Sequence, residues 1–400
     1  MKHNRNTSVG LRAVMRREFR RIRTRKTLWM LLIIMPILIF ITIAAIYSRG
    51  VVRDLPMAVC DQDHSTLSRA IVRSLAANPT FKIVAYAQNT EELKQGFKQG
   101  KIQAAVCIPP GTERSLKKGK DGTVVFYQNA ANIIIGKVAF KAAVSTIRTL
   151  SLALQVHKIQ ATGASWQQAL DRTLPIRVQT QSLYNPAYNY ENYLVGGLLP
   201  ILYQMVVMIS AVLLISAEIE EDTIRDAYRL AGENIFVLTL GKALPHLLIH
   251  TANVLLLVGI IFPVFHIPVH GSVAILIAYL LYFVLVALVL GMFLSCLFTD
   301  MMLATEAAIF LSTPAFIFTG YTFPLEAMPG IHYWYAQLLP STHFMSGFIK
   351  LYQMGTSLRF IVPELIDLSI FLVVSLSGLL LLMYWRKQKW CAPQIEWQEA

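Results

Sequence analysis

The stretch from Leu194 to Leu230 reads LVGGLLPILYQMVVMISAVLLISAEIEEDTIRDAYRL, and its character changes at Ala217. Residues Leu194 to Ala217 form an apolar run that is long enough to cross a bilayer as a helix, at about 20 residues per span. From Glu218 to Arg229 the chain is densely charged, and each charge at the centre of a bilayer would cost about 3 kcal/mol or more. The sequence therefore predicts a membrane exit between Ala217 and Glu218.

The charged segment behind this exit has apolar residues at helical spacing. Ile219, Ile224 and Tyr228 recur among acidic residues and arginines, which predicts a short amphipathic helix in residues 218–236. A charged helix that is held between two membrane spans can transmit motion between a soluble protein and a membrane protein. We expect the rest of the chain to be organised around it.

The composition is that of an integral membrane protein. The chain has 400 residues, of which 55% are hydrophobic and 15% charged, whereas soluble domains carry about 25% charged residues. The net charge of +13 could indicate nucleic-acid binding, but no zinc-finger spacing, RNP motif or recognition-helix pattern accompanies it. Four scattered cysteines are too few for a disulfide framework and do not form a CxxC metal motif.

The N-terminal region predicts a surface helix followed by a membrane anchor. Residues 1–27 are strongly basic, and the apolar residues among them recur at helical spacing, as in a helix on an anionic leaflet. The next apolar run, 28–48, contains Pro36 and is too long for the core of a cleaved signal peptide. The basic cluster places the N-terminus in the cytoplasm. The apolar residues of the predicted surface helix are Leu11, Val14, Met15, Phe19 and Ile22.

Residues 49–190 predict an extracytoplasmic α/β domain, because short strand patterns alternate with short helical patterns. A longer helical stretch, 130–162, follows them. The surface of this domain is basic, which fits either a solvated surface or attraction to an anionic partner or lipid. The predicted strands are 56–60, 81–86, 103–108 and 123–127, and the predicted short helices are 65–77, 91–99 and 112–118.

Four polar or thiol groups in this domain need an interpretation. Cys60 and Cys107 lie in predicted strands and are expected to be buried free thiols. A disulfide between them is the alternative in an oxidising compartment. Asp61 and Asp63 precede a helical segment, and such residues make a turn and a helix cap more often than a catalytic dyad.

The remaining apolar runs complete a set of six spans, which returns the C-terminus to the cytoplasm with its basic tail, 386–400. Residues 322–362 are too apolar for a free loop and too interrupted by proline for a span. We therefore expect a re-entrant hairpin or interfacial helices at the outer leaflet. Besides 28–48, the predicted spans are 194–217, 237–262, 273–298, 304–321 and 363–385.

Motifs for catalysis are absent from the sequence. It has no GxxxxGK[ST], HExxH or GxSxG, so we expect no ATP hydrolysis by this chain and no cofactor bound to it. His246 and His250 share a helix face, but no third ligand lies near them in the sequence, and helix packing or a polar role facing a cavity is favoured over a metal site.

Taken together, these features resemble an ABC-2 type transporter permease, the membrane subunit of a type V ABC exporter. The resemblance is strongest to bacterial permeases that carry a large periplasmic domain between their first two spans. It covers almost the whole chain and depends on several motifs in the order expected for the family. These motifs are Arg16–Pro36, Ala58–Ser68, Ile108–Pro110, Glu218–Arg229, Phe318–Pro329 and Leu339–Phe344.

The resemblance implies roles for three groups of residues. The N-terminal amphipathic helix is the connecting helix of the family, the segment after the second span is the coupling helix that contacts the ATPase, and 322–362 is the hairpin that helps to gate release. Two positions depart from the family's pattern, because Asp222 stands where glycine is usual and Arg225 where glutamate is usual. The implied residues are Arg16, Arg17, Arg20 and Arg21 for the connecting helix, Glu218, Glu220, Glu221, Asp222, Thr223 and Arg225 for ATPase coupling, and Phe323, Pro324 and Pro329 for the outer gate.

The function implied is that of a permease for export of an amphipathic drug, lipid or lipid-linked molecule from the cytoplasm or inner leaflet. The implied setting is the bacterial inner membrane. The partners would be a cytoplasmic ABC ATPase that binds ATP and Mg²⁺, a second permease chain, either identical or related, and membrane lipid. Whether the chain also binds a periplasmic adaptor protein is left open. A membrane-anchored ligand-binding receptor would need only one or two spans. A proton-coupled secondary transporter would favour paired carboxylates at the midplane and repeated halves.

Overall fold

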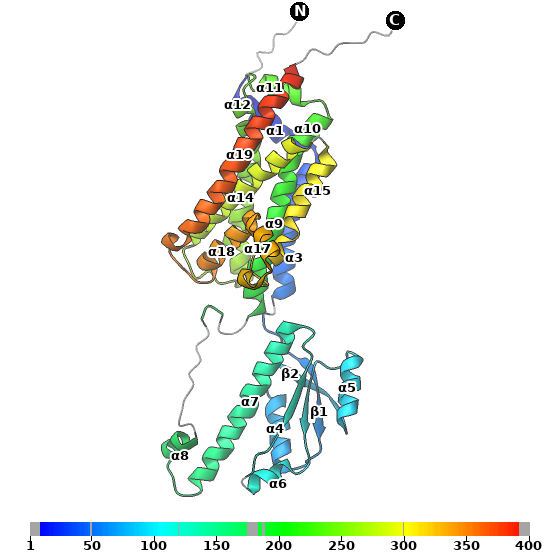
Figure 1. Ribbon diagram of the computed structural model, residues 1–400, viewed down its shortest axis with the longest axis vertical. Coiled ribbons are helices and arrows are strands. Elements are labelled where there is room, and N and C mark those ends of the chain that lie inside the picture. The colour runs from blue at the N-terminus through cyan, green and yellow to red at the C-terminus, as the bar shows by residue number, and fades with distance from the viewer. Residues whose placement is uncertain are drawn as a thin grey trace, which may run out of the picture. The chain divides into compact units, whose positions relative to one another are not determined.

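The computed structural model describes residues 9–48, 50–118, 120–173, 183–185, 189–298 and 300–391. The chain divides into two compact units (Figure 1). A helical unit comprises Met1–Ser48 and Glu191–Ala400, and an α/β unit comprises Arg49–Tyr190. This division confirms the prediction of an α/β region inserted between the first two spans.

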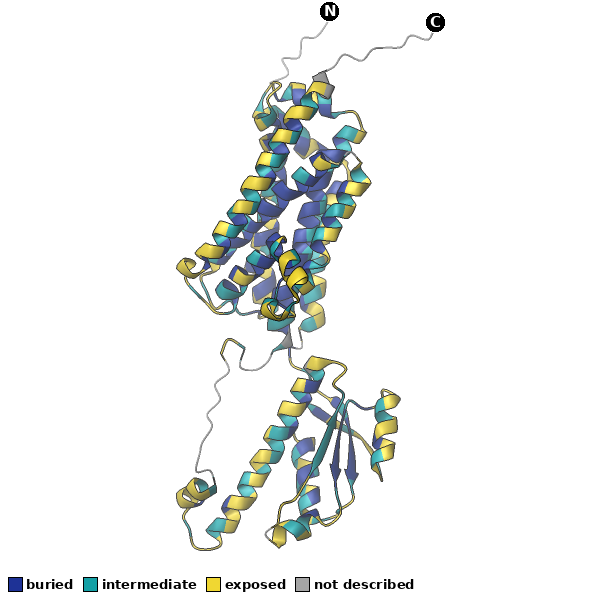
Figure 2. Cartoon of the chain, in the orientation of Figure 1, coloured by how far each residue is buried: buried dark blue, intermediate teal, exposed yellow. Residues whose placement is uncertain are grey.

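Within the described residues, six helices are long and apolar enough to cross a membrane, as predicted. Their buried faces pack into one apolar core (Figure 2). Five of the six observed spans begin two to five residues before the predicted apolar runs, and all six end within three residues of the predicted ends. The observed spans are Lys26–Tyr47, Glu191–Glu220, Ile235–Val264, Val273–Leu297, Met301–Phe318 and Leu358–Gln388.

The first span contains a π-helical turn, η1 (Met30–Ile34), between α2 (Lys26–Trp29) and α3 (Met35–Tyr47). It lies directly before Pro36, whose missing N–H would otherwise bond the carbonyl of Leu32. The Asn253 side-chain amide donates to that carbonyl at 2.9 Å and satisfies it. The third span, α12 (Ile235–Leu256), η2 (Leu257–Ile261) and α13 (Phe262–Val264), repeats the arrangement with a π-helical turn just before Pro263.

The second span breaks once near its charged end. Helix α9 (Tyr190–Leu213) stops, and α10 (Ser216–Glu220) begins after a two-residue turn. Ser295, on α14 (Val273–Leu297), fills the break: its hydroxyl donates to the Val212 carbonyl and accepts from the Ser216 amide, both at 2.8 Å. The sequence predicted one continuous helix here, because the run from Leu213 to Ala217 carries no proline or glycine.

The segment predicted as a re-entrant hairpin, 322–362, contains four short helices. Helix α18 (Pro340–Tyr352) packs deep in the bundle, where the Phe344 ring stacks on Phe283 with centroids 3.8 Å apart. Helix α17 (Gly330–Gln337) instead exposes Ile331 and Trp334. The helices of this part of the chain are α15 (Met301–Ser312), α16 (Ala315–Phe318), η3 (Leu325–Ala327), α17 (Gly330–Gln337), α18 (Pro340–Tyr352), η4 (Leu358–Ile361) and α19 (Val362–Cys391).

The α/β unit contains a four-stranded sheet of order β2-β1-β3-β4. Strands β1 (Leu55–Asp61), β2 (Phe81–Tyr86) and β3 (Ala104–Ile108) are parallel, and β4 (Val125–Gln128) is antiparallel to β3. All four lie within two residues of their predicted ranges. The sequence missed α8 (Trp166–Thr173). The other helices are α4 (Thr66–Ala76), α5 (Thr90–Lys98), α6 (Thr112–Lys117) and α7 (Ile133–Gln160).

Helices cover both faces of this sheet (Figure 1). On one face, Met57 and Val106 pack with α4 and α7. On the other, Cys60 and Cys107 lie side by side on neighbouring strands, close to α5, as free buried thiols. Asp61 accepts hydrogen bonds from the Asp63 and His64 amides and from the Ser68 hydroxyl, so it makes the predicted turn. The cap of α4 is Ser65, whose hydroxyl accepts from the Ser68 amide at 3.0 Å.

Candidate functional site: the charge network around Glu218

Helix α1 (Leu11–Thr24) packs against two other parts of the helical unit. One is the charged segment that follows the second span, and the other is the third span. The first turn of α1 is held where the Gly10 amide donates to the Leu230 carbonyl of α11 (Ile224–Leu230) at 2.9 Å. One turn on, Val14 lies against Gly241 of α12, where a Cβ would come within 2.6 Å of the valine side chain. Only glycine allows this approach, so the position of α1 on α12 depends on Gly241.

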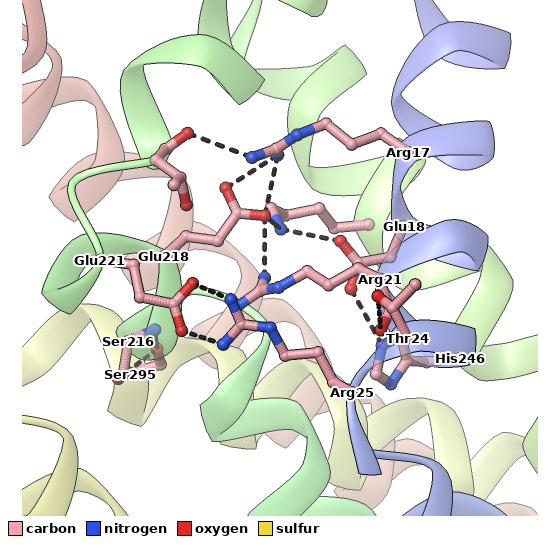
Figure 3. A network of polar contacts seen from close by, with 12 residues as sticks. Arg17, Glu18, Arg21, Thr24, Arg25, Ser216, Glu218, Glu221, His246 and Ser295 are labelled. Carbon is pink, nitrogen blue, oxygen red and sulfur yellow. Dashed lines mark hydrogen bonds and ion pairs between the residues drawn. The ribbon is translucent and has the colours of Figure 1, made fainter. Parts of the chain in front are cut away.

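Glu218 on α10 is the centre of the site (Figure 3). Its carboxylate is fully buried and accepts from Arg17 Nη1 at 2.9 Å on both oxygens and from Arg21 Nη1 at 2.8 Å. On α12, Lys242 Nζ donates to it at 2.6 Å. One carboxylate therefore joins α1, α10 and α12.

A second buried carboxylate, Glu18 on α1, extends the site toward α12. Lys242 Nζ donates to it at 2.9 Å and His246 Nε2 lies 3.3 Å away, so Lys242 bridges Glu18 and Glu218 (Figure 3 draws the Glu18 and Glu218 contacts). Burial alone would raise the pKa of the Glu18 carboxyl, but the Lys242 ammonium, with His246 and Arg21, holds it well below its usual range. Glu18 is therefore ionised at neutral pH. We call Arg17, Glu18, Arg21, Glu218, Lys242 and His246 the charge network.

An outer ion pair lies next to the network, between Arg25 and Glu221 (Figure 3). The hydrogen bond from Arg25 lowers the pKa of the Glu221 carboxyl. Both side chains are substantially exposed, and such pairs contribute at most about 1 kcal/mol to stability.

The charge network is costly to disrupt, because all of its members except the partly exposed Arg17 are buried. Removing one partner of a buried ion pair typically costs about 3–5 kcal/mol, since the remaining charge stays buried without compensation. The elements that supply these ions come from three separate parts of the chain. The network therefore joins α10 to α1 and to the third span.

The residues implied for the connecting helix divide into two pairs. Arg17 and Arg21 point into the charge network, and Arg17 Nη2 also donates to the Thr223 carbonyl at 3.3 Å. Arg16 and Arg20 are exposed. The apolar stripe predicted to face lipid packs partly against α12 instead, because Val14 is buried there.

The segment implied for ATPase coupling forms two short helices rather than the single helix predicted. Asp222 lies in the turn between them with φ 54°, a left-handed conformation that glycine adopts most easily, and its carboxylate is 3.8 Å from Arg225. Glu220, Glu221 and Asp222 are exposed, whereas Glu218 is buried. Contact of this segment with an ATPase stays a prediction, and the buried Glu218 could take part only through the network.

Sequence reasoning missed Glu18 and Lys242 as members of the site. A signal was available, because Glu18 falls in the middle of the apolar stripe of α1, four residues from both Val14 and Ile22. Lys242 likewise stands alone in an apolar span. An isolated charge in each of two apolar faces indicates a buried ion pair.

His246 and His250 contact different partners. His250 is fully buried, with the Tyr203 hydroxyl 2.9 Å from Nδ1 and the Ser210 hydroxyl 3.3 Å from Nε2. In the described part of the chain, no cluster of three or more His, Cys, Asp and Glu side chains could hold a metal ion. The implied gate residues Phe323, Pro324 and Pro329 are all exposed around η3.

Comparison with known proteins agrees with this architecture. The profile of the family described as ABC-2 family transporter protein matches residues 25–381. The chain is 20% identical over 392 residues to the probable multidrug ABC transporter permease YbhS of Escherichia coli. The aligned region covers 95% of this chain and 96% of YbhS. It is 21% identical over 302 residues to the permease YbhR of the same organism, covering 74% and 77%. The chain therefore belongs to the ABC-2 family as a transporter permease.

Proposed function

We propose that this chain is the permease of an ATP-driven exporter, and that α10 and α11 bind an ATPase subunit on the cytoplasmic side. Membership of the family implies partnering with a nucleotide-binding ATPase subunit. The observation that carries the coupling role is the burial of Glu218 with simultaneous bonds to α1 and α12. Force applied to α10 and α11 would reach two other elements through this carboxylate.

The surface of α10 and α11 supports this assignment. Ile224, Ala227 and Tyr228 of α11 and Ser216 and Glu218 of α10 are buried, so both helices pack against the bundle. Their outer face presents charged side chains that a partner can recognise, namely Glu221, Asp222, Asp226 and Arg229.

For the cargo, we propose an amphipathic molecule such as a drug or a lipid, moved out of the cytoplasm or the inner leaflet of a bacterial inner membrane. The related permeases YbhS and YbhR are named as probable multidrug transporters. The basic N-terminal segment and the even number of spans favour cytoplasmic termini. The exporter would contain a second permease chain, either a copy or a related one.

The coupling assignment is tested by site-specific photo-cross-linking in native membranes. A cross-linker at Asp226 should capture a protein that contains a GxxxxGK[ST] motif, identified by mass spectrometry. A cross-linker at Glu91, an exposed residue of α5, is the matched control and should not capture it. Capture of the ATPase from Glu91 and not from Asp226 would overturn the assignment.

The transport role is tested in proteoliposomes that contain this chain with the captured ATPase. Efflux of an amphipathic fluorescent dye should require ATP and both proteins, and the purified permease alone should not hydrolyse ATP. ATP-independent efflux by the permease alone would rule out the proposed function.

A further inference from the structure

A cavity of about 390 Å³ opens beside the charge network. Its apolar wall comes from Leu28, Leu213, Ala217 and Met301, which lie near the ends of the first, second and fifth spans. The volume is in the range of sites that bind small ligands, about 300–1,000 Å³. Because three spans end here, an occupant would lie at the depth of lipid headgroups.

One polar side of the cavity carries a guanidinium nitrogen that lacks a hydrogen-bond partner. Arg21 lines the cavity, is more than nine-tenths buried and forms an ion pair with Glu218 through Nη1; its Nη2, which is also buried, has no partner among the described residues. If His246 is not counted, the charge network contains three cations and two carboxylates, Glu18 and Glu218. A buried guanidinium nitrogen in this setting favours an anionic oxygen as its acceptor.

The other polar side of the cavity carries the opposite charge. Glu220 lines it, is exposed, and has no ion pair or hydrogen bond to any part of the chain that the structure describes. Arg25 and Glu221 also line the cavity, but they neutralise each other. Among the described residues, the cavity therefore offers one guanidinium nitrogen and one carboxylate that have no partner.

We propose that this cavity binds the phosphoethanolamine headgroup of a membrane phospholipid. The phosphate would accept from Arg21, with the Thr27 hydroxyl beside it, and the primary ammonium would donate to Glu220. The acyl chains would leave along the apolar wall formed by Leu28 and Met301. An anionic headgroup without an ammonium leaves Glu220 uncompensated, and a choline headgroup has no N–H to donate to it.

The inference is independent of the proposed transport function, because it concerns a resident lipid rather than the cargo. It is tested by native mass spectrometry of the full chain with phosphatidylethanolamine, phosphatidylcholine and phosphatidylglycerol of identical acyl chains. The first lipid bound should be phosphatidylethanolamine, with an affinity about tenfold higher than either of the others, as for one well-made charged hydrogen bond.

In Glu220→Gln, the affinity for phosphatidylethanolamine should exceed that for the other two lipids by no more than about twofold, because a neutral amide loses most of the attraction for the ammonium. Glu306→Gln, another exposed carboxylate at the same end of a span, is the control and should retain it. Arg21→Lys should weaken all three lipids, and its thermal unfolding shows whether the bundle is intact.

Three results would overturn the proposal. They are tighter binding of phosphatidylglycerol than of phosphatidylethanolamine, an unchanged preference in Glu220→Gln, and displacement of the bound lipid by soluble phosphoethanolamine at equal concentration. The last result would indicate a site for the free headgroup rather than for a lipid.

Discussion

Lys242 connects the two carboxylates of the charge network, with Nζ 2.9 Å from Glu18 and 2.6 Å from Glu218. All three groups are fully or almost fully buried. Because their charges compensate one another only in the folded bundle, the free energy of unfolding should depend strongly on each of them and should not be additive between them.

Lys242→Met should lower the free energy of unfolding by about 3–5 kcal/mol, because it leaves two buried carboxylates without their shared cation. Adding Glu18→Gln should restore about 1 kcal/mol or more, since one of those carboxylates is then neutral. Denaturant unfolding of the purified chain in detergent measures both variants. Arg359→Met, an exposed cation of the same unit, should change stability by no more than about 0.5 kcal/mol. Equal stability of Lys242→Met and the parent would show that the network is not stabilising.

Cys60 should react slowly with thiol reagents. Burial, together with the neighbouring Cys107, raises the pKa of the Cys60 thiol from 9.0 to about 11. Since the thiolate is the reactive form, its fraction at pH 8 falls about 100-fold, and the rate should rise tenfold per pH unit below pH 11. Iodoacetamide labelling followed by peptide mass spectrometry measures the rate, with the unfolded chain as reference. Rapid labelling of the folded chain, or recovery of a Cys60–Cys107 disulfide, would contradict this prediction.

At the residue scale, the sequence predicted part of the site. The two arginines of α1 that reach Glu218 were among those implied by the resemblance. Glu18 could not be paired with Lys242, because the two lie 224 residues apart and only the crossing of α1 over α12 brings them together. The small residue that permits this crossing, Gly241, carries no signal of its own in an apolar span.

At the scale of elements, the break between α9 and α10 depends on one hydroxyl of another span. Ser295 serves the Val212 carbonyl, the Ser216 amide and the Ser216 hydroxyl, each at 2.8 Å. Helix α10 begins directly after the break, two residues before Glu218. The rigidity of the break therefore determines how closely α10 moves together with the charge network.

Ser295→Ala should leave the Ser216 amide unpaired and leave the Val212 carbonyl with only the 3.4 Å bond from the Ile215 amide, at a local cost of about 1–3 kcal/mol. Hydrogen exchange of the Ser216 amide should then accelerate at least about tenfold, since 1.4 kcal/mol corresponds to a factor of ten. Thr305→Ala is the control, because within the described part of the chain that hydroxyl bonds only the Met301 carbonyl of its own helix. Unchanged exchange at Ser216 would mean that the break is held by packing alone.

The elements themselves were largely predictable, for different reasons in the two units. The strands were found because apolar runs such as Ala104–Ile108 lie between turn residues and helix caps. The helix break was missed, because its cause, Ser295, is 79 residues away from Ser216. The single amphipathic helix predicted after the second span became two helices, because Asp222 takes a left-handed conformation that an α-helix cannot continue.

At the scale of the molecule, the two units have separate cores. Among the described residues, the apolar core of the helical unit contains none from the α/β unit, whose own core lies on both faces of its sheet. Ala139 and Ala143 of α7 complete one face together with Ile71 and Leu75 of α4. Within the described residues, the α/β unit therefore has the layers that a domain needs to fold by itself.

A fragment of residues 50–173 should therefore be soluble and should unfold cooperatively in denaturant, with a circular dichroism spectrum of mixed helix and strand. A shorter fragment, 50–130, lacks α7 and would expose Val106 and Leu75 on one face of the sheet and helix layer, so it should aggregate or show no cooperative transition. The comparison isolates the contribution of α7, since both fragments contain all four strands. A stable, monomeric 50–130 fragment would show that the sheet with α4 and α5 is sufficient. An unfolded 50–173 fragment would show that this unit requires the helical unit in order to fold.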